Sequence, residues 1–430
     1  MIRFISHHCL LLSEGVIVLE FVNKMRNNSF IFLSVLASLM AVNSLSTDVY
    51  LPALPAMTEM LGPGAELTIS GYLFGFMIAQ LVWGPISDSI GRIKPLIMGS
   101  VLFVIGTIGC ATADTMTELV IWRIFQAIGA CVGPMLSRAM IRDRYSLAEA
   151  ADKLSLITML MAGAPIVGPS IGGLIVEFAS WHMIFWAVAV VGVLIGIGTF
   201  FLPETLPEER RNKAGIKKAF KIYGELFADW AFMKYTLCVA FFYMGAYAII
   251  AGTPYVYITY YGIPERYFGA LFAMNVIGVV IFSSLNRALV ARYTMDTLLR
   301  AATLGTMAAV LLLVFMTYTN VWGVYGVILS VVLIFATNGI IAACATAAAL
   351  DKAGDKAGTA AALIGSLQYG SGIVSSVALA IFFNNTPWPM VGTIVVCMAI
   401  CAWLAWSKTP VRENEENNDS ITANDACTQE

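Results

Sequence analysis

The chain has 430 residues, of which 59% are hydrophobic and only 12% carry a charged side chain, and its net charge is −2. Soluble proteins carry roughly 25% charged residues, so this composition excludes an ordinary soluble domain and indicates an integral membrane protein. The small net charge says nothing by itself about partners other than the lipid bilayer, and we expect no nucleic acid among them.

The first segment, residues 1–27, precedes the first long apolar run. Its short apolar stretch is interrupted by Glu14 and Glu20 and has no small-residue cleavage site, so it does not fit a signal peptide. Met25 stands directly before the first apolar run. We therefore expect residues 1–27 to be an N-terminal extension and Met25 to be a candidate for the native start, which the mass of the native N-terminus would test.

Twelve apolar stretches follow, and each is near the length of about 20 residues that a bilayer-spanning helix needs. They are too long and too uniformly apolar for the strands of a membrane barrel. The predicted spans are residues 28–52, 66–86, 95–113, 117–140, 154–177, 183–202, 233–255, 267–287, 298–317, 322–348, 359–383 and 389–407. The expected fold class is all-α and integral to the membrane, with twelve transmembrane helices in two six-helix halves.

The two halves, residues 28–205 and 231–407, are separated by the polar segment 206–230. This segment is basic and mildly amphipathic, which fits either a helix on the inner membrane surface or a loop whose charge only fixes the topology. Residues 408–430 are rich in Glu, Asn and Asp, so we expect a disordered cytoplasmic tail there.

Lysine and arginine are distributed unequally between the two sides of the predicted membrane. With the N-terminus inside, the inner loops carry nearly all of these residues, and the outer loops carry only Arg266. Because this bias sets the orientation of membrane proteins, both termini are predicted to be cytoplasmic.

Two ionisable side chains, Asp48 and Arg123, lie well inside the predicted spans. A charge in hydrocarbon costs at least ~2.5 kcal/mol, so such residues are usually paired, face a cavity and serve a function. Both lie at comparable depth, in spans 1 and 4. We hypothesise that Asp48 binds a proton and that Arg123 tunes its proton affinity.

Structural roles remain open for both residues. Asp48 could instead cap or pin the bent end of span 1 beside Pro52. Arg123 could instead bridge spans 1 and 4 through backbone oxygens. Gln126 shares the helix face of Arg123, three residues on, and is predicted to support it.

The sequence offers little for enzymatic chemistry. It has no GxxxxGK[ST] phosphate loop, and none of its histidines, His7, His8 and His182, lies deep in a span. No catalytic triad, metal-binding motif or intramembrane carboxylate pair is present. We therefore predict neither an enzyme nor a metal site, and no cofactor other than a proton gradient.

The loop after span 2 reads Gly84-Pro-Ile-Ser-Asp88-Ser-Ile-Gly91-Arg92-Ile-Lys-Pro-Leu. Gly84 is expected to allow close approach of a neighbouring helix, and Gly91 to form a tight turn. Asp88 is expected to bond a helix N-terminus or an arginine and so to latch the inner side shut. The pattern resembles the G-x-L-a-D-r-x-G-R-[RK]-x-x-L loop of the major facilitator superfamily, although Ser89 replaces a basic residue.

Further motifs carry the same resemblance. Span 4 holds Arg123-x-x-Gln-x-x-Gly, and span 5 holds a glycine–proline pattern that resembles the signature of exporters in this superfamily, formed by Pro165, Gly168, Pro169, Gly172 and Gly173. The end of span 1 and the start of span 11 are similar to the bicyclomycin/chloramphenicol resistance (Bcr/CflA) branch of drug/proton antiporters. The resemblance covers roughly residues 28–407.

The resemblance implies a monomeric transporter of the bacterial inner membrane in which spans 1, 4, 7 and 10 line a central cavity. It would alternate between inward- and outward-facing states and exchange protons for a small organic solute, a drug or antibiotic. A dedicated exporter of a nucleoside, sugar or amino acid is the alternative, and the sequence does not separate the two.

Polar and aromatic residues at mid-span are the candidate solute contacts, because aromatic walls with a few hydrogen-bonding groups suit small amphipathic molecules. Tyr243 and Tyr247 share one helical face of span 7. The set consists of Asn43, Tyr50, Gln80, Gln126, Tyr243, Tyr247, Tyr255, Asn275, Asn338 and Gln368.

Overall fold

The computed structural model describes residues 29–146, 149–150, 152–154, 156–157, 163–211, 215–290 and 292–407. The predicted extension 1–27, the predicted tail 408–430 and part of span 5 lie outside these residues. The described part of the chain is helical and contains no strand, in agreement with the predicted all-α class.

The first half contains eight helices of eight residues or more in the described residues, and two of the predicted spans, 1 and 4, are divided. These helices are α2 (Ser29–Asp48), α3 (Leu54–Leu61), α4 (Glu66–Ile90), α5 (Ile93–Ala111), α6 (Met116–Ala130), α7 (Val132–Arg144), α9 (Ala164–Phe178) and α10 (His182–Thr199), with α3 a short extension of span 1. A short 3-10 helix, η1 (Leu51–Ala53), joins α2 to α3. Span 1 is therefore not one straight helix to residue 52, because α2 ends at Asp48 ahead of Pro52.

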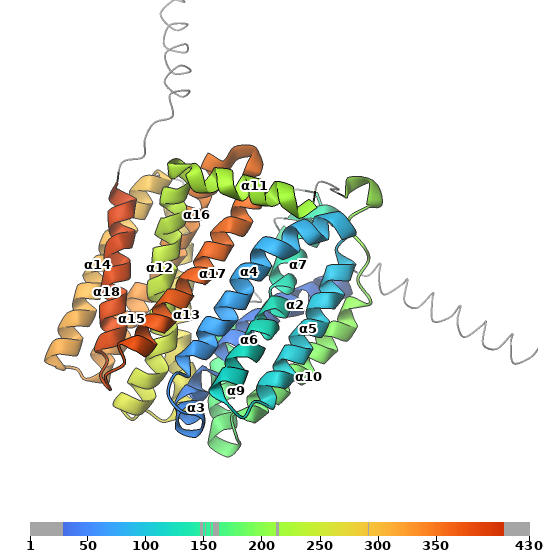
Figure 1. Cartoon of the computed structure of the whole chain (residues 1–430). Helices are drawn as coiled ribbons and strands as arrows, with labels where there is room; N and C mark the ends of the chain where they lie inside the picture. Colours follow the sequence, from blue (N-terminus) through green and yellow to red (C-terminus); the bar gives the residue numbers. More distant parts are fainter. Residues whose placement is uncertain are drawn as a thin grey trace, which may run out of the picture.

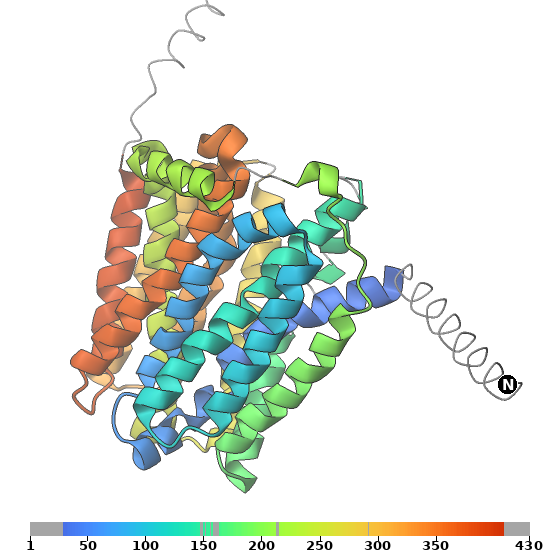
Figure 2. The same ribbon diagram turned by 45° about the vertical axis from the view of Figure 1, so that its right-hand side comes forward.

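The second half follows the amphipathic helix α11 (Gly215–Ala228). Its helices are α12 (Trp230–Pro254), α13 (Phe268–Leu289), α14 (Met295–Thr319), α15 (Val324–Ala336), α16 (Asn338–Ala353), α17 (Ala357–Ile381) and α18 (Trp388–Trp406). Residues 215–228 of segment 206–230 are therefore helical, and the position of this helix on the membrane surface stays a prediction. Figures 1 and 2 show α11 lying across one end of the bundle. We call this end, which is predicted to be cytoplasmic, the inner end, and the opposite end the outer end.

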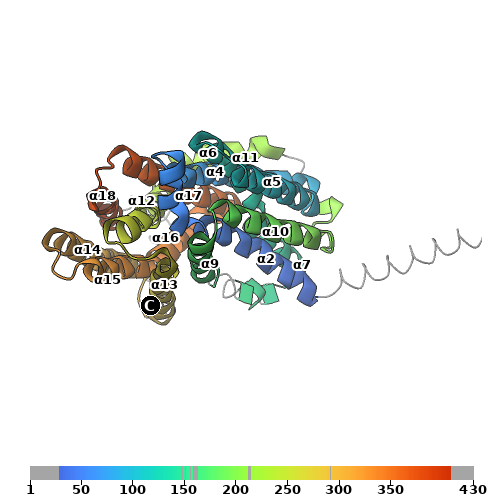
Figure 3. The ribbon, with the colours of Figure 1, turned by 90° about the horizontal axis from the view of Figure 1, so that it is seen from below.

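Eleven helical segments of the described chain are long and apolar enough to cross a membrane. The described part of predicted span 5 is the 15-residue helix α9, which is shorter than a full span. Seen along the bundle in Figure 3, the helices form two groups side by side. Large apolar side chains such as Ile197, Leu311 and Trp403 are more than half exposed on these helices, as expected for surfaces that contact lipid.

In the described residues, two main helix pairs join the halves, α4 with α17 and α9 with α13. Along the α4–α17 seam, the contact between α4 and α17, Ser366 Oγ donates to Met77 O at 3.1 Å. Gly370 and Gly372 on α17 leave no room for a Cβ beside Met77 and Leu73, so the two backbones approach closely. At the outer end, α9 meets α13, and Arg266 Nη1 lies 3.0 Å from Glu177 Oε1.

Candidate functional site

A cavity of about 350 Å³ lies between the two halves. Spans 1, 4, 7 and 10 contribute to its wall through α2, α6, α12 and the α15–α16 segment, and α4, α9, α13 and α17 add further residues. Its polar lining comprises Asn43, Ser44, Thr47, Asp48, Tyr50, Tyr72, Arg123, Tyr243, Tyr247, Asn338, Gln368 and Tyr369. Among these lining residues, Asp48 and Arg123 are the two that ordinarily carry charge.

Arg123 is held by aromatic rings and neutral oxygens. Its side chain is 1% exposed, and its guanidinium carbon lies 4.3 Å from the ring centres of both Tyr50 and Tyr72. One terminal nitrogen, Nη1, donates to the backbone oxygen of Ser46 at 3.0 Å and to Gln126 Oε1 at 2.6 Å. Nε has no hydrogen-bond partner among the described residues. The ring faces stabilise the cation without neutralising it.

Gln126 supports Arg123 from behind, outside the cavity. It is fully buried, accepts from Arg123, and donates from Nε2 to Thr107 Oγ1 at 2.9 Å. Because its amide oxygen and amide nitrogen are both bonded and it does not line the cavity, Gln126 is positioned to orient the guanidinium rather than to contact a solute.

Asp48 is 7% exposed and is the last residue of α2. A carboxylate at a helix C-terminus faces the negative end of the helix dipole, so Asp48 does not stabilise this end as a cap would. No ion pair joins Asp48 to Arg123 among the described residues. The bridge between spans 1 and 4 instead runs from Arg123 to the backbone oxygen of Ser46. Both charged groups line the same cavity without direct pairing.

The glycine–proline pattern of span 5 packs directly against the end of span 1. Pro165 lines the cavity beside Asp48. A Cβ at Gly172 would overlap Val49 O, and one at Gly173 would overlap Glu265 O of the second half. Gly168 and Pro169 are buried on the same helix, where a Cβ at Gly168 would meet that of Asp48 at ordinary contact distance.

Six of the ten candidate solute contacts line the cavity: Asn43, Tyr50, Tyr243, Tyr247, Asn338 and Gln368. Apart from Gln126, the other three are placed elsewhere. Gln80 packs between α17 and Cys131, Asn275 is buried behind the wall, and Tyr255 lines a crevice at the outer end. Depth in a span does not determine which face of a helix a residue occupies, which explains these misplacements.

Tyr72 and Tyr369 line the cavity but were not among the sequence candidates. Tyr72 donates from its hydroxyl to Asn43 Oδ1 at 2.8 Å. The ring of Tyr369 lies 6.5 Å from that of Tyr247 and 4.1 Å from that of Phe76. Both are mid-span tyrosines, the same signal that selected Tyr243 and Tyr247, so the sequence did contain the information needed to include them.

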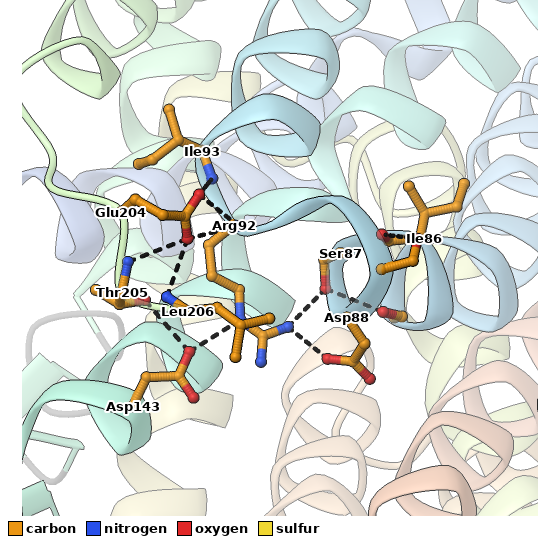
Figure 4. Close-up of polar contacts among 11 residues, drawn as sticks. Ile86, Ser87, Asp88, Arg92, Ile93, Asp143, Glu204, Thr205 and Leu206 are labelled. Carbon is orange, nitrogen blue, oxygen red and sulfur yellow. Dashed lines mark hydrogen bonds and ion pairs between the residues drawn. The ribbon is translucent and has the colours of Figure 1, made fainter. Parts of the chain in front are cut away.

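The inner loop after α4 is organised around Arg92, as Figure 4 shows. Arg92 Nη1 lies 2.6 Å from Asp88 Oδ1 and donates to Ser87 Oγ at 2.8 Å. Arg92 Nε lies 2.9 Å from Asp143 Oδ2 at the end of α7. Of the two expected partners of Asp88, the observed one is therefore an arginine in its own loop.

A different carboxylate, Glu204, binds the N-terminus of α5. It accepts from the backbone N–H of Arg92 at 2.9 Å and of Ile93 at 3.2 Å. Gly91 has φ of 94°, and a Cβ there would overlap Glu204, so the expected tight turn is present. The expectation for Gly84 is wrong, because the nearest atom to a Cβ there is Met135 Sδ at 4.0 Å.

A family model described as Major Facilitator Superfamily matches residues 36–376. The chain belongs to the major facilitator superfamily. It is 33% identical over 378 residues to an uncharacterised MFS-type transporter, YdgK, of Bacillus subtilis, covering 86% of this chain and 93% of that protein. It is 30% identical over 385 residues to a bicyclomycin resistance protein homolog of Haemophilus influenzae, covering 87% and 95%.

A solved structure of a D-xylose–proton symporter has the same fold, with a TM-score of 0.72 at 16% identity, covering 89% of this chain and 98% of that one. These relationships confirm the resemblance to the Bcr/CflA branch and establish a transporter rather than an enzyme. With bacterial relatives and, in its described part, eleven apolar segments long enough to span a bilayer, the chain is a multi-pass protein of the inner membrane.

Proposed function

We propose that this transporter is a proton-coupled antiporter that exports a small organic solute, a drug or antibiotic, by alternating access. The observation that carries the proposal is the cavity between the halves, in which one carboxylate, Asp48, faces the same space as an arginine with which it forms no ion pair. The proposal includes twelve spanning helices, cytoplasmic termini, a monomeric state and a proton gradient as the energy source.

Asp48 is the proton carrier in this proposal. Burial disfavours a charged carboxylate, whereas the Arg123 cation favours it, so the balance changes when the cavity opens to water on one side. A proton that bonds to Asp48 from the outer side is released on the inner side after the halves rearrange. The solute moves in the opposite direction through the same cavity.

The shape of the lining supports a small amphipathic solute. Tyrosines and amides form one part of the wall, and Phe272, Val276, Val279 and Phe335 form an apolar part. Pockets of this kind orient a molecule through a few polar contacts and bury its apolar portion. The resistance named for the Haemophilus relative is consistent with an antibiotic as the solute.

Proteoliposomes containing the full chain test the proposal. An imposed proton gradient should drive solute movement, and solute should drive proton movement, in a panel of antibiotics and of nucleosides, sugars and amino acids. Asp48→Asn should abolish the coupling while the protein remains folded, because an amide does not titrate. Unchanged coupling in this variant would refute the role of Asp48, and exchange of metabolites alone would favour the dedicated exporter.

A further inference from the structure

A second carboxylate lies between the two halves, at the outer end of the α4–α17 seam. Glu66, the first residue of α4, lines a crevice whose other walls include Gly252 and Tyr255 from the second half. Leu379, Phe383 and Thr386 close the crevice from α17 and the loop after it. Its volume is about 20 Å³, which is room for a single water molecule.

The surroundings of Glu66 are apolar and aromatic. Its side chain is half-buried, and it has no ion-pair partner among the described residues. The ring of Tyr255 lies 5.0 Å from that of Phe383, and Tyr255 is the one other titratable residue in the lining. The acidic residues on the neighbouring outer ends, Glu59 on α3, Asp114 before α6 and Glu118 within it, are exposed.

Ionisation of Glu66 is unfavourable in a crevice of this size. A carboxylate taken from bulk water needs several hydrogen-bond donors or a cation. The lining contains no cation, and its side-chain donors are two hydroxyl groups, that of Tyr255 and that of Thr386, which already donates to Asn384 Oδ1. A protonated carboxyl group fits the closed crevice, whereas an ionised one gains hydration if α4 moves away from α12 and α17. Protonation therefore favours the closed outer seam, and ionisation favours its separation.

Glu66 also stands at a helix N-terminus, where an acidic side chain interacts favourably with the helix dipole. Glu118 provides a comparison, since it occupies the first turn of α6 but is exposed and does not line the crevice. Any effect that Glu66 has and Glu118 lacks comes from the position between the halves.

We propose that Glu66 is a second proton-binding group of the exchange cycle, which holds the outer seam closed when protonated and favours its opening when ionised. A proton from water at the outer surface bonds to a carboxylate oxygen, and it returns to that water when the seam opens. The inference rests on the proposed proton-coupled function, and it adds a group that responds to the pH of the outer side.

Distance measurements between the halves test the inference in the full chain. Spin labels at Met60→Cys on α3 and Val321→Cys after α14, both exposed outer positions, report the separation of the outer ends in a background with the native cysteines replaced. These distances are measured at a series of pH values in the Asp48→Asn background, in which position 48 has no titratable group. Raising the pH should increase the ratio of open to closed distances by ~10-fold or more.

The variants decide the origin of that response. Glu66→Gln should remain closed at every pH, Glu66→Asp should restore the response, and Glu118→Gln should behave like its parent. A pH response that persists in Glu66→Gln, or that Glu118→Gln removes equally, overturns the inference. The proposed function is judged separately, by whether Asp48→Asn abolishes exchange in liposomes with Glu66 intact.

Discussion

Arg92 and Arg123 are both buried in the first half of the molecule, with 7% and 1% exposure, but their charges are balanced differently. Arg92, in the inner loop, contacts two carboxylates, Asp88 and Asp143. Arg123, beside the cavity, contacts two tyrosine rings, an amide oxygen and a backbone oxygen. Neutral partners hold a cation in place without cancelling its field, so Arg123 remains able to respond to charge in the cavity.

The two arginines therefore have different roles, one in the structure of the inner loop and one at the cavity. Arg92 connects the α4–α5 loop to the end of α7, and Glu204 ties the same loop to the segment after α10, all within the first half. Such a cluster fixes the loop as a rigid unit. Arg123 differs from Arg92 because it lines the same cavity as Asp48 without forming an ion pair with it. Its fixed position therefore makes the cavity sensitive to protonation of Asp48.

Replacement of Arg123 should have the largest effect on transport. We expect Arg123→Leu to reduce proton-coupled exchange by roughly 100-fold or more, about 2.7 kcal/mol, because the cavity loses its positive charge. Arg123→Lys keeps the charge but loses the planar stack on Tyr50 and Tyr72, so it should retain part of the activity. Proton flux in liposomes measures both, and unchanged coupling in Arg123→Leu would remove the distinction between the two arginines.

Replacement of Arg92 should act mainly on stability. Arg92→Gln leaves Asp143, whose side chain is 20% exposed, without its cation, and should lower the free energy of unfolding by about 2 kcal/mol. Thermal unfolding in detergent measures the change. Arg142→Gln, at an exposed position of α7, is the matched control and should change stability by less than about 0.5 kcal/mol. Equal losses in both variants would contradict the role given to Arg92.

Two replacements of Tyr72 separate the hydroxyl from the ring. Tyr72→Phe removes the bond to Asn43 and keeps the ring over Arg123, so the expected loss of stability is about 1 kcal/mol. Tyr72→Leu also removes the ring and should cost about 1–2 kcal/mol more. Thermal unfolding compares them, and identical stabilities would show that the ring does not stabilise the cation.

The smallest effect is expected at the surface pair of Glu225 on α11 and Lys356 before α17, with Nζ 2.7 Å from Oε2. The hydrogen bond from Lys356 and its charge lower the pKa of Glu225. Its stabilising contribution is therefore present above the ordinary carboxyl pKa of 4.5 and is lost as the pH falls through the lowered value. Stability curves of wild type and Lys356→Gln should converge in acid. A constant difference between them would contradict this assignment.

Much of the fold could be predicted because hydropathy directly reports burial in a bilayer. The spans, the polar segment 206–230 and the Bcr/CflA resemblance follow from patterns along the chain. The sequence indicated a bent end of span 1 beside Pro52, but not that the helix ends at Asp48, because that position depends on how this segment packs against the glycines of α9. The placement of Gln80, Asn275 and Tyr255 outside the cavity depended on helix rotation, which hydropathy does not specify.

The sequence by itself determined that this protein is a membrane transporter of a known superfamily and that Asp48 and Arg123 are its unusual intramembrane charges. Composition, apolar length and motif spacing suffice for this, because a bilayer permits few backbone arrangements. Only the tertiary structure decided that Arg123 lies between two tyrosine rings, that Glu204 rather than Asp88 binds the start of α5, and that Glu66 lies between the halves. These features depend on contacts between residues far apart in the chain, which no local pattern encodes.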